Sequence, residues 1–133
     1  MEKYKNVNYN SLVNLLSSFN KVEKIPEKVI FASTISVYGE RLNINNYNEK
    51  LLPEPSSPYA ITKLKAEQYL LDKFADKSWI LRFAPIYSSD FLLNINRRTR
   101  IGNTFYKVGN GSKKLSLCNI KNIETVIKGI IKD

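Results

Sequence analysis

Tyr59 and Lys63 are the first residues whose types and spacing suggest chemistry. They stand four positions apart in the segment 58–67, so on a helix their side chains would project from one face about one turn apart. A lysine ammonium held near a phenol favours the phenolate form, and a tyrosine in that form can act as a base. The same spacing also occurs on ordinary amphipathic helices, where the pair has only a structural role.

Hydroxyl side chains gather upstream of this pair, in the segment FASTISVYG at residues 31–39. The apolar, β-branched run at 28–33 predicts a buried strand, so these hydroxyls would stand at its carboxyl end. Ligands bind beyond the carboxyl ends of strands in open α/β sheets, so these hydroxyls would stand where a ligand binds. The structural alternative is that Thr34 caps its own loop.

The composition limits the chemistry open to these residues. The chain of 133 residues has no histidine and one cysteine, Cys118. Zinc sites and Ser-His or Cys-His nucleophiles cannot be built from this set, so no metal site is expected and acid–base steps must use Tyr, Lys, Asp or Glu. No apolar stretch approaches the ~20 residues that span a bilayer, and no apolar secretory segment follows Met1. We therefore expect a cytoplasmic chain without a membrane partner.

The elements expected to position these residues alternate along the chain. Strand, helix and strand at 28–33, 58–74 and 79–87 predict one right-handed crossover of a parallel sheet with strands buried on both faces, and hence an α/β fold. The long loop at 39–57 is typical of functional loops. The other expected elements are a helix at 9–20, short strands at 106–108 and 114–118 about the turn 109–111, and a helix at 123–131.

Positive charge is concentrated in the last third of the chain. Residues 94–133 carry 9 basic and 2 acidic side chains, against 12 and 10 in residues 1–93. A phosphorylated small ligand or a solvated basic face would each explain this excess. Few aromatic residues are interleaved with the basic ones, which argues against nucleic acid as a partner. The candidate phosphate-binding residues are Arg97, Arg98, Lys113 and Lys114.

Three segments in order give the sequence a family resemblance. FASTISVYGE, PEPSSPYAITKLKAEQYL and WILRFAPIYS closely resemble the extended short-chain dehydrogenase/reductase family, which includes NAD-dependent sugar-nucleotide epimerases and dehydratases. The likeness covers residues 8 to about 131. It implies the C-terminal part of a Rossmann-type parallel sheet with part of a small substrate-binding lobe. Residues 1–93 would be a partial NAD(P)-binding region, and residues 94–133 a partial basic substrate lobe.

The resemblance also implies roles for individual residues. Thr34 would be the catalytic hydroxyl, Tyr59 the acid/base, and Lys63 the residue that contacts the nicotinamide ribose and tunes Tyr59. Hydride would pass to NAD or NADP and, in an epimerase, return. Glu67 is expected on the helix surface. The residues expected to line the cofactor site are Ala32, Ser33, Tyr59, Lys63, Pro85 and Ile86.

Departures from the family pattern narrow the expected reaction. In family members that eliminate water, one or both of the positions after the catalytic Ser or Thr are acidic. In this sequence these positions are Ile35 and Ser36, which favours a nucleotide-sugar 4-epimerase. The segment Arg82–Pro85 lacks the Asn that contacts substrate in many epimerases of the family. Leu115 and Ser116 stand where many members have an Arg-Asp pair near the nucleotide diphosphate. The identity of the substrate is therefore left open by the sequence. A carbonyl or hydroxysteroid-type reductase is the alternative.

One expected feature of a complete cofactor site is absent. No Gly-rich strand-to-helix turn occurs before residue 28, and the first glycine is Gly39, so the pyrophosphate cradle is absent and the choice between NAD and NADP is open. The strand at 28–33 is then expected to have an open edge, suited to self-association or to a partner chain. A split enzyme, a non-catalytic interaction module and a decayed gene fragment are all compatible with this.

Overall fold

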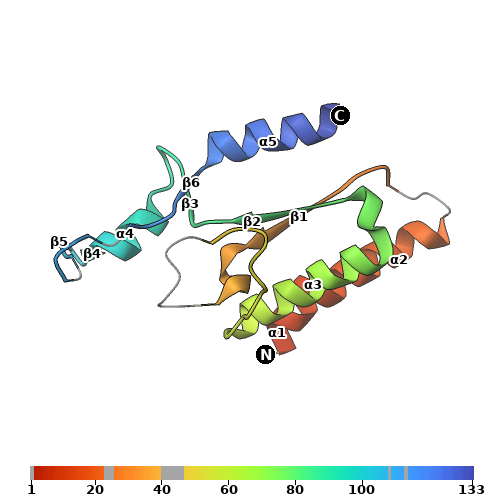
Figure 1. The fold of residues 1–133 in the computed structure, drawn as a ribbon, viewed down its shortest axis with the longest axis horizontal. Coiled ribbons are helices and arrows are strands. Elements are labelled where there is room, and N and C mark those ends of the chain that lie inside the picture. Colours follow the sequence, from red (N-terminus) through yellow and green to blue (C-terminus); the bar gives the residue numbers. More distant parts are fainter. Residues whose placement is uncertain (1, 23–25, 40–46, 108, 113) are drawn as a thin grey trace. The chain divides into compact units, whose positions relative to one another are not determined.

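The computed structural model of the chain describes residues 2–22, 26–39, 47–107, 109–112 and 114–133. These form two compact units, Met1–Arg82 and Phe83–Asp133 (Figure 1). The predicted division into a cofactor region at 1–93 and a substrate lobe at 94–133 concerns function and stays a prediction.

The first unit begins with helix. The short helix α1 (Glu2–Lys5) continues through a wider π-helical turn (Asn6–Asn10) into α2 (Ser11–Lys21). The helix predicted at 9–20 is therefore confirmed, but it is one part of a longer helical segment. Leu16 is its buried anchor.

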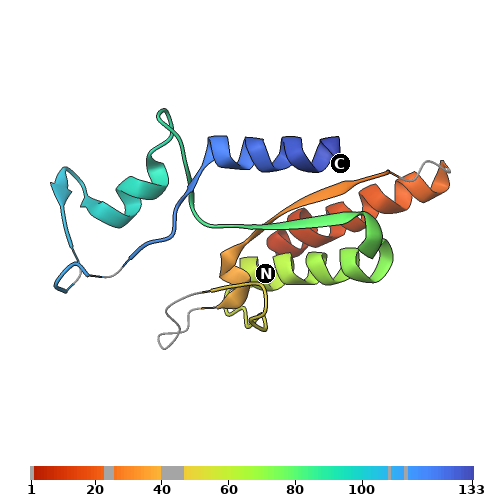
Figure 2. The same ribbon diagram turned by 45° about the horizontal axis from the view of Figure 1, so that its top comes forward.

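The predicted strand–helix–strand crossover is confirmed in this unit. Strand β1 (Val29–Thr34) and strand β2 (Ser78–Phe83) are hydrogen-bonded neighbours that run in the same direction, and helix α3 (Pro58–Phe74) connects them (Figures 1 and 2). Helix α3 is followed by a 3-10 turn (Ala75–Lys77). Its buried face carries Ala60, Thr62, Ala66, Glu67 and Leu70.

The two strands are less buried than the sequence predicted. Ser33 is the buried residue of β1, whereas Ala32 is exposed, and 42% of Trp79 on β2 is exposed. The prediction of burial on both faces is wrong within this unit, because α1, α2 and α3 all lie on one side of the β1–β2 pair (Figure 2). Among the described residues the sheet has two strands, so each strand keeps one edge without a strand neighbour.

A tight turn follows β1 and fixes the start of the long loop. The 3-10 turn Ile35–Tyr38 buries Val37 and Tyr38, and Gly39 ends it at φ +75°. A Cβ at Gly39 would stand 2.2 Å from the carbonyl oxygen of Glu54, so both the conformation and the close approach require glycine. The Glu54 amide donates to the Val37 carbonyl at 2.9 Å. The described part of the predicted loop, residues 39 and 47–57, contains no helix or strand.

The second unit is built on a short parallel pair. Strand β3 (Ile86–Tyr87) pairs with β6 (Cys118–Asn119) in the register Ile86 to Cys118. Between them lie helix α4 (Leu93–Thr99) and a hairpin of β4 (Arg100–Ile101) with β5 (Thr104–Phe105). Helix α5 (Ile120–Lys132) follows β6.

Three sequence predictions in this region need correction. The strand expected at 79–87 is broken into β2 and β3, with Pro85, which has no N–H to donate, in the break. The strands predicted at 106–108 and 114–118 are wrong: the described residues 106–107 and 114–117 belong to no strand. The strand of this region is Thr104–Phe105, which pairs antiparallel with Arg100–Ile101. Val108 and Lys113 lie outside the described residues.

The last helix starts three residues earlier than expected. The side chain of Asn119 accepts a hydrogen bond from the Lys121 amide at 2.9 Å and so caps the helix at Ile120. Ile123 and Ile130 form its buried stripe. None of the described helices is long and apolar enough to cross a membrane.

Candidate active site

Lys63 reaches from α3 to the carboxyl end of β1. Its Nζ donates to the carbonyl oxygen of Ala32 at 2.8 Å and lies 4.8 Å from the centre of the Phe31 ring. Partial burial lowers the pKa of Lys63, and the negative charge of Glu67 acts in the opposite direction. The partly desolvated ammonium of Lys63 therefore binds the backbone at Ala32, two residues before Thr34.

Thr34 is the last residue of β1 and caps the turn that follows. Its Oγ1 accepts from the Ser36 amide at 3.2 Å and lies 3.2 Å from Ser36 Oγ. The capping role that the sequence offered as an alternative is thus present. Thr34 Oγ1 is the donor toward Ser36 Oγ, so the turn occupies the single donor and one of the two acceptor lone pairs of this hydroxyl.

Tyr59 is the second residue of α3, one turn before Lys63 on the same helix face. The ring packs edge-on against Tyr4, with 6.0 Å between ring centres, and 37% of the residue is exposed. The helix start that places Tyr59 is fixed by Ser57, whose hydroxyl accepts from the Ala60 amide at 3.2 Å.

An ionic network that was not predicted from the sequence connects α3 with β2 and with the end of β1. Glu67 is 1% exposed, so its predicted surface position is wrong. Arg82 Nη2 donates to the Glu67 carboxylate at 2.6 Å, and Arg82 Nε lies 3.1 Å from each of the two carboxylate oxygens. The hydroxyl of Ser33 also donates to this carboxylate. Arg82 Nη1 donates to the Tyr38 hydroxyl at 2.7 Å.

The burial of Glu67 has a signal in the sequence. Arg82 is the one charged residue in the strand segment WILRF, and a guanidinium in such a strand needs a carboxylate partner. Glu67 lies four residues after Lys63, on the face of α3 that meets the strands. In the structure the hydrogen bonds with Glu67 keep the pKa of Arg82 above its usual value.

The remaining residues predicted at the cofactor site lie in both units. The Ala32 carbonyl is bound by Lys63, and the buried Ser33 hydroxyl is bound by Glu67. Pro85 and Ile86 belong to the second unit, where the Pro85 carbonyl accepts from the Cys118 amide at 3.0 Å and the Ile86 carbonyl from Asn94 Nδ2 at 2.8 Å. Their roles toward a cofactor stay predictions.

The predicted phosphate-binding residues lie in the second unit. Arg97 and Lys114 are exposed, and Arg98 donates through Nη1 to the Asn94 carbonyl one turn earlier in α4, at 2.8 Å. Lys113 lies outside the described residues. Among the three described residues of this set, Arg97 and Lys114 are therefore the exposed ones.

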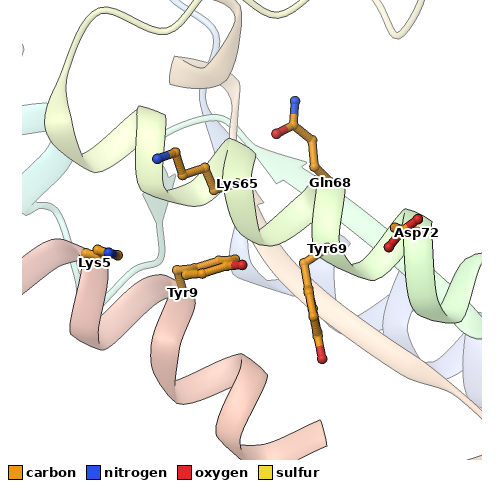
Figure 3. A pocket seen from close by; sticks show the side chains of 6 residues that line it. All are labelled: Lys5, Tyr9, Lys65, Gln68, Tyr69 and Asp72. Atoms are coloured by element: carbon orange, nitrogen blue, oxygen red, sulfur yellow. The ribbon is translucent and has the colours of Figure 1, made fainter. Parts of the chain in front are cut away.

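The described surface also has a hollow on another face of α3, of about 510 Å³ (Figure 3). Tyr9 and Tyr69 meet edge-on in it, 6.1 Å between ring centres. No residue predicted for the active site lines this hollow. Its lining residues are Lys5, Tyr9, Lys65, Gln68, Tyr69 and Asp72. Among the described residues, no cluster of His, Cys, Asp and Glu is suited to a metal ion.

Comparison with protein families decides the relationship. The model of the NAD dependent epimerase/dehydratase family matches residues 1–127. The chain belongs to this family. Among curated proteins, none matches the chain.

Solved structures of family members share the fold. UDP-glucuronic acid 4-epimerase from Bacillus cereus, in complex with UDP-glucuronic acid and NAD, superposes with a TM-score of 0.70 at 25% identity over 95% of this chain. The dTDP-glucose 4,6-dehydratase from Bacillus anthracis, in complex with NAD, gives 0.69 at 20% identity over 93%. RMD from Pseudomonas aeruginosa, complexed with NADPH, gives 0.66 at 21% over 90%. The predicted α/β class and the resemblance to part of a Rossmann-type fold are confirmed.

The chain spans less than half the length of each of these structures. It covers 41% of the epimerase, 42% of the dehydratase and 46% of RMD. This agrees with the sequence, which contains no Gly-rich turn before Gly39.

Proposed function

We propose that this chain carries the catalytic set of an NAD-dependent nucleotide-sugar epimerase that works by reversible hydride transfer. The observation that supports it best is the hydrogen bond from Lys63 to the Ala32 carbonyl. This bond holds the ammonium at the carbonyl of Ala32, two residues before Thr34, near the carboxyl end of β1, where ligands of α/β sheets bind. Tyr59 stands one turn before Lys63 on the same helix. The family membership supplies the reaction class.

The residues present fit one end of a nicotinamide cofactor. Lys63 offers an ammonium donor for ribose hydroxyls, and the exposed Ala32 leaves the floor of the site without a bulky side chain. The pyrophosphate end needs close backbone approach at a Gly-rich turn, which this sequence lacks before Gly39. We infer that this chain holds the nicotinamide ribose and that another chain or segment would hold the pyrophosphate.

Proton transfer would be the work of this chain's own residues. Tyr59 takes the proton of the sugar hydroxyl that is oxidised and returns it when the carbonyl is reduced. Lys63 brings a positive charge one turn later on the same helix, and Thr34 donates a hydrogen bond to the same sugar oxygen in place of Ser36 Oγ. When bound, NAD supplies the carbon that accepts and returns the hydride.

The substrate proposed is a nucleotide diphosphate sugar. The B. cereus neighbour, at 25% identity, was solved in complex with UDP-glucuronic acid and NAD, which makes uridine diphosphate sugars the first class to try. Exposed Arg97 and Lys114 offer positive charge for the diphosphate. A partner chain or a second copy that pairs with the free edge of β1 is proposed as the way the sheet is extended.

Product analysis tests the proposed reaction. The full chain is incubated with NAD and UDP-glucuronic acid, and the isomer ratio and the absorbance of NADH are followed together. We expect isomer interconversion without net NADH, a rate at least ~100-fold lower in Tyr59→Phe, and no change in Tyr69→Phe on the other face of α3. Absence of conversion by the folded chain would overturn the proposal for the chain on its own. Stoichiometric turnover of the cofactor would instead indicate a reductase.

A further inference from the structure

We propose that the buried ion pair between Glu67 and Arg82 is a positioning device that fixes Thr34 and Lys63 relative to each other. Neither residue of the pair is assigned a part in the chemistry, and the proposal rests on the function proposed above. It is carried by the way the pair connects α3, both strands of the sheet and the turn after Thr34.

The first connection is between α3 and the end of β1. Ser33 donates to Glu67, and the neighbouring Ala32 accepts from Lys63 at 2.8 Å. Glu67 and Lys63 are one helical turn apart, so two successive residues of the strand are held by two successive turns of the helix. Thr34 follows directly, and its backbone position is therefore set by both bonds.

The second connection is between β2 and the turn that Thr34 caps. Arg82 binds Glu67 with Nε and Nη2 and uses Nη1 to donate to the Tyr38 hydroxyl at 2.7 Å. Its guanidinium carbon also lies 4.8 Å from the centre of the Tyr38 ring. Tyr38 ends the turn that begins after Thr34, so the network holds the residue before Thr34 and the far end of its turn.

Charge makes the arrangement sensitive to the identity of residue 67. Among the described residues, the guanidinium of Arg82 and the hydroxyl of Ser33 both donate to the Glu67 carboxylate, and the guanidinium forms an ion pair with it. Lys63 also interacts with Glu67 through its charge, and that interaction raises the pKa of Lys63 against the effect of burial. A neutral side chain at 67 would leave Arg82 unpaired in a partly buried site.

Two readouts on the full chain without cofactor test the proposal. NMR measures the pKa of the Lys63 ammonium and the amide hydrogen exchange of Ser36 and Gly39, whose amides bond to Thr34 Oγ1 and to the Ser36 carbonyl. In Glu67→Gln we expect the Lys63 pKa to fall further and exchange at both amides to speed up on the order of tenfold. A Lys63 pKa equal to that of the wild type, or exchange within about twofold of it, would overturn the proposal.

The matched control is Glu124→Gln on α5. Glu124 pairs with Lys128 four residues on, at 2.5 Å, but both side chains are exposed. Its removal is expected to leave Lys63 and the Thr34 turn unchanged. If Glu124→Gln moved the same signals, the effect would be one of overall charge, and the positioning role would be wrong.

Milder variants decide the matter if Glu67→Gln does not fold. Ser33→Ala and Tyr38→Phe each delete one hydroxyl of the network and keep the ion pair. Each should speed exchange at Ser36 and Gly39 several-fold and leave the Lys63 pKa in place. Unchanged exchange in both variants would overturn the proposal. Because no readout uses NADH, these results are independent of whether the chain binds a cofactor.

Discussion

At the scale of single residues, the proposed site is a set of polar groups that the fold partly removes from water. Lys63 is bound to the Ala32 carbonyl, and Ser33 is bound to Glu67, so the end of β1 is held by α3 at two points. Burial lowers the pKa of Lys63 despite the opposing charge of Glu67. The lysine is thus held in a position that costs stability while it is charged.

This cost predicts a pH dependence of stability. Below its folded-state pKa, Lys63 is charged in both states and folding bears the desolvation cost. As the pH rises toward the ordinary value of 10.5, the folded state loses the proton first and the cost is relieved. Urea unfolding should therefore show that the free energy of unfolding of the wild type, relative to Lys63→Met, increases as the pH rises toward 10.5. A constant or falling difference would contradict the assigned burial.

The sequence suggested some residues of the proposed site and not others, for a physical reason. Tyr59 and Lys63 share one helix, so their spacing alone predicts that they share one face of it. Glu67 and Arg82 come from different elements 15 positions apart, and only the packing of α3 on the strands joins them. A glutamate on a helix has the same local pattern whether it faces water or a buried arginine.

At the scale of elements, helix α3 is the part of the fold that the sequence specifies best. Its observed span, Pro58–Phe74, equals the predicted one, because Ser57 caps it and Pro58 suits the first helical position. The short strands of the second unit were predicted poorly. Two-residue strands carry no periodicity, and the hairpin is set by Gly102, whose φ of +59° permits the turn between β4 and β5.

The cap of α3 gives a prediction at this scale. Ser57→Ala removes the acceptor of the Ala60 amide and should lower the free energy of unfolding by about 1 kcal/mol. Because Tyr59 stands two residues later, fraying of this end should also raise the exposure of its ring. Urea unfolding and tyrosine fluorescence measure the two effects. The neighbouring exposed Ser56, changed to alanine, serves as control and should shift stability by no more than ~0.5 kcal/mol.

At the scale of the whole molecule, the chain corresponds to less than half of its solved relatives. Its sheet in the first unit has two described strands with helices on one side, and its sequence has no Gly-rich turn before Gly39. The groups proposed for the nicotinamide ribose are present, and the described residues before Gly39 include no Gly-rich turn that would suit the pyrophosphate. A cofactor should therefore be recognised by one end.

One-ended recognition predicts how cofactor fragments bind. Reduced nicotinamide mononucleotide, which lacks the adenosine half, should bind the full chain with an affinity within about threefold of that of NADH. The reason is that the adenosine half would gain few contacts. Equilibrium dialysis compares the two ligands. An affinity for NADH more than about tenfold higher would mean that this chain also holds the pyrophosphate or adenosine, against the account given.

The central claim is that Lys63, bound at the end of β1, forms the nicotinamide site. The most direct test is a fluorescence titration of the full chain with NADH, in the wild type, in Lys63→Ala and in Lys65→Ala, whose exposed side chain lies on the other face of α3. The account predicts saturable binding by the wild type and by Lys65→Ala, and binding at least about tenfold weaker in Lys63→Ala. A folded wild-type chain that shows no saturable binding, or a Lys63→Ala chain that binds as well as the wild type, would contradict it.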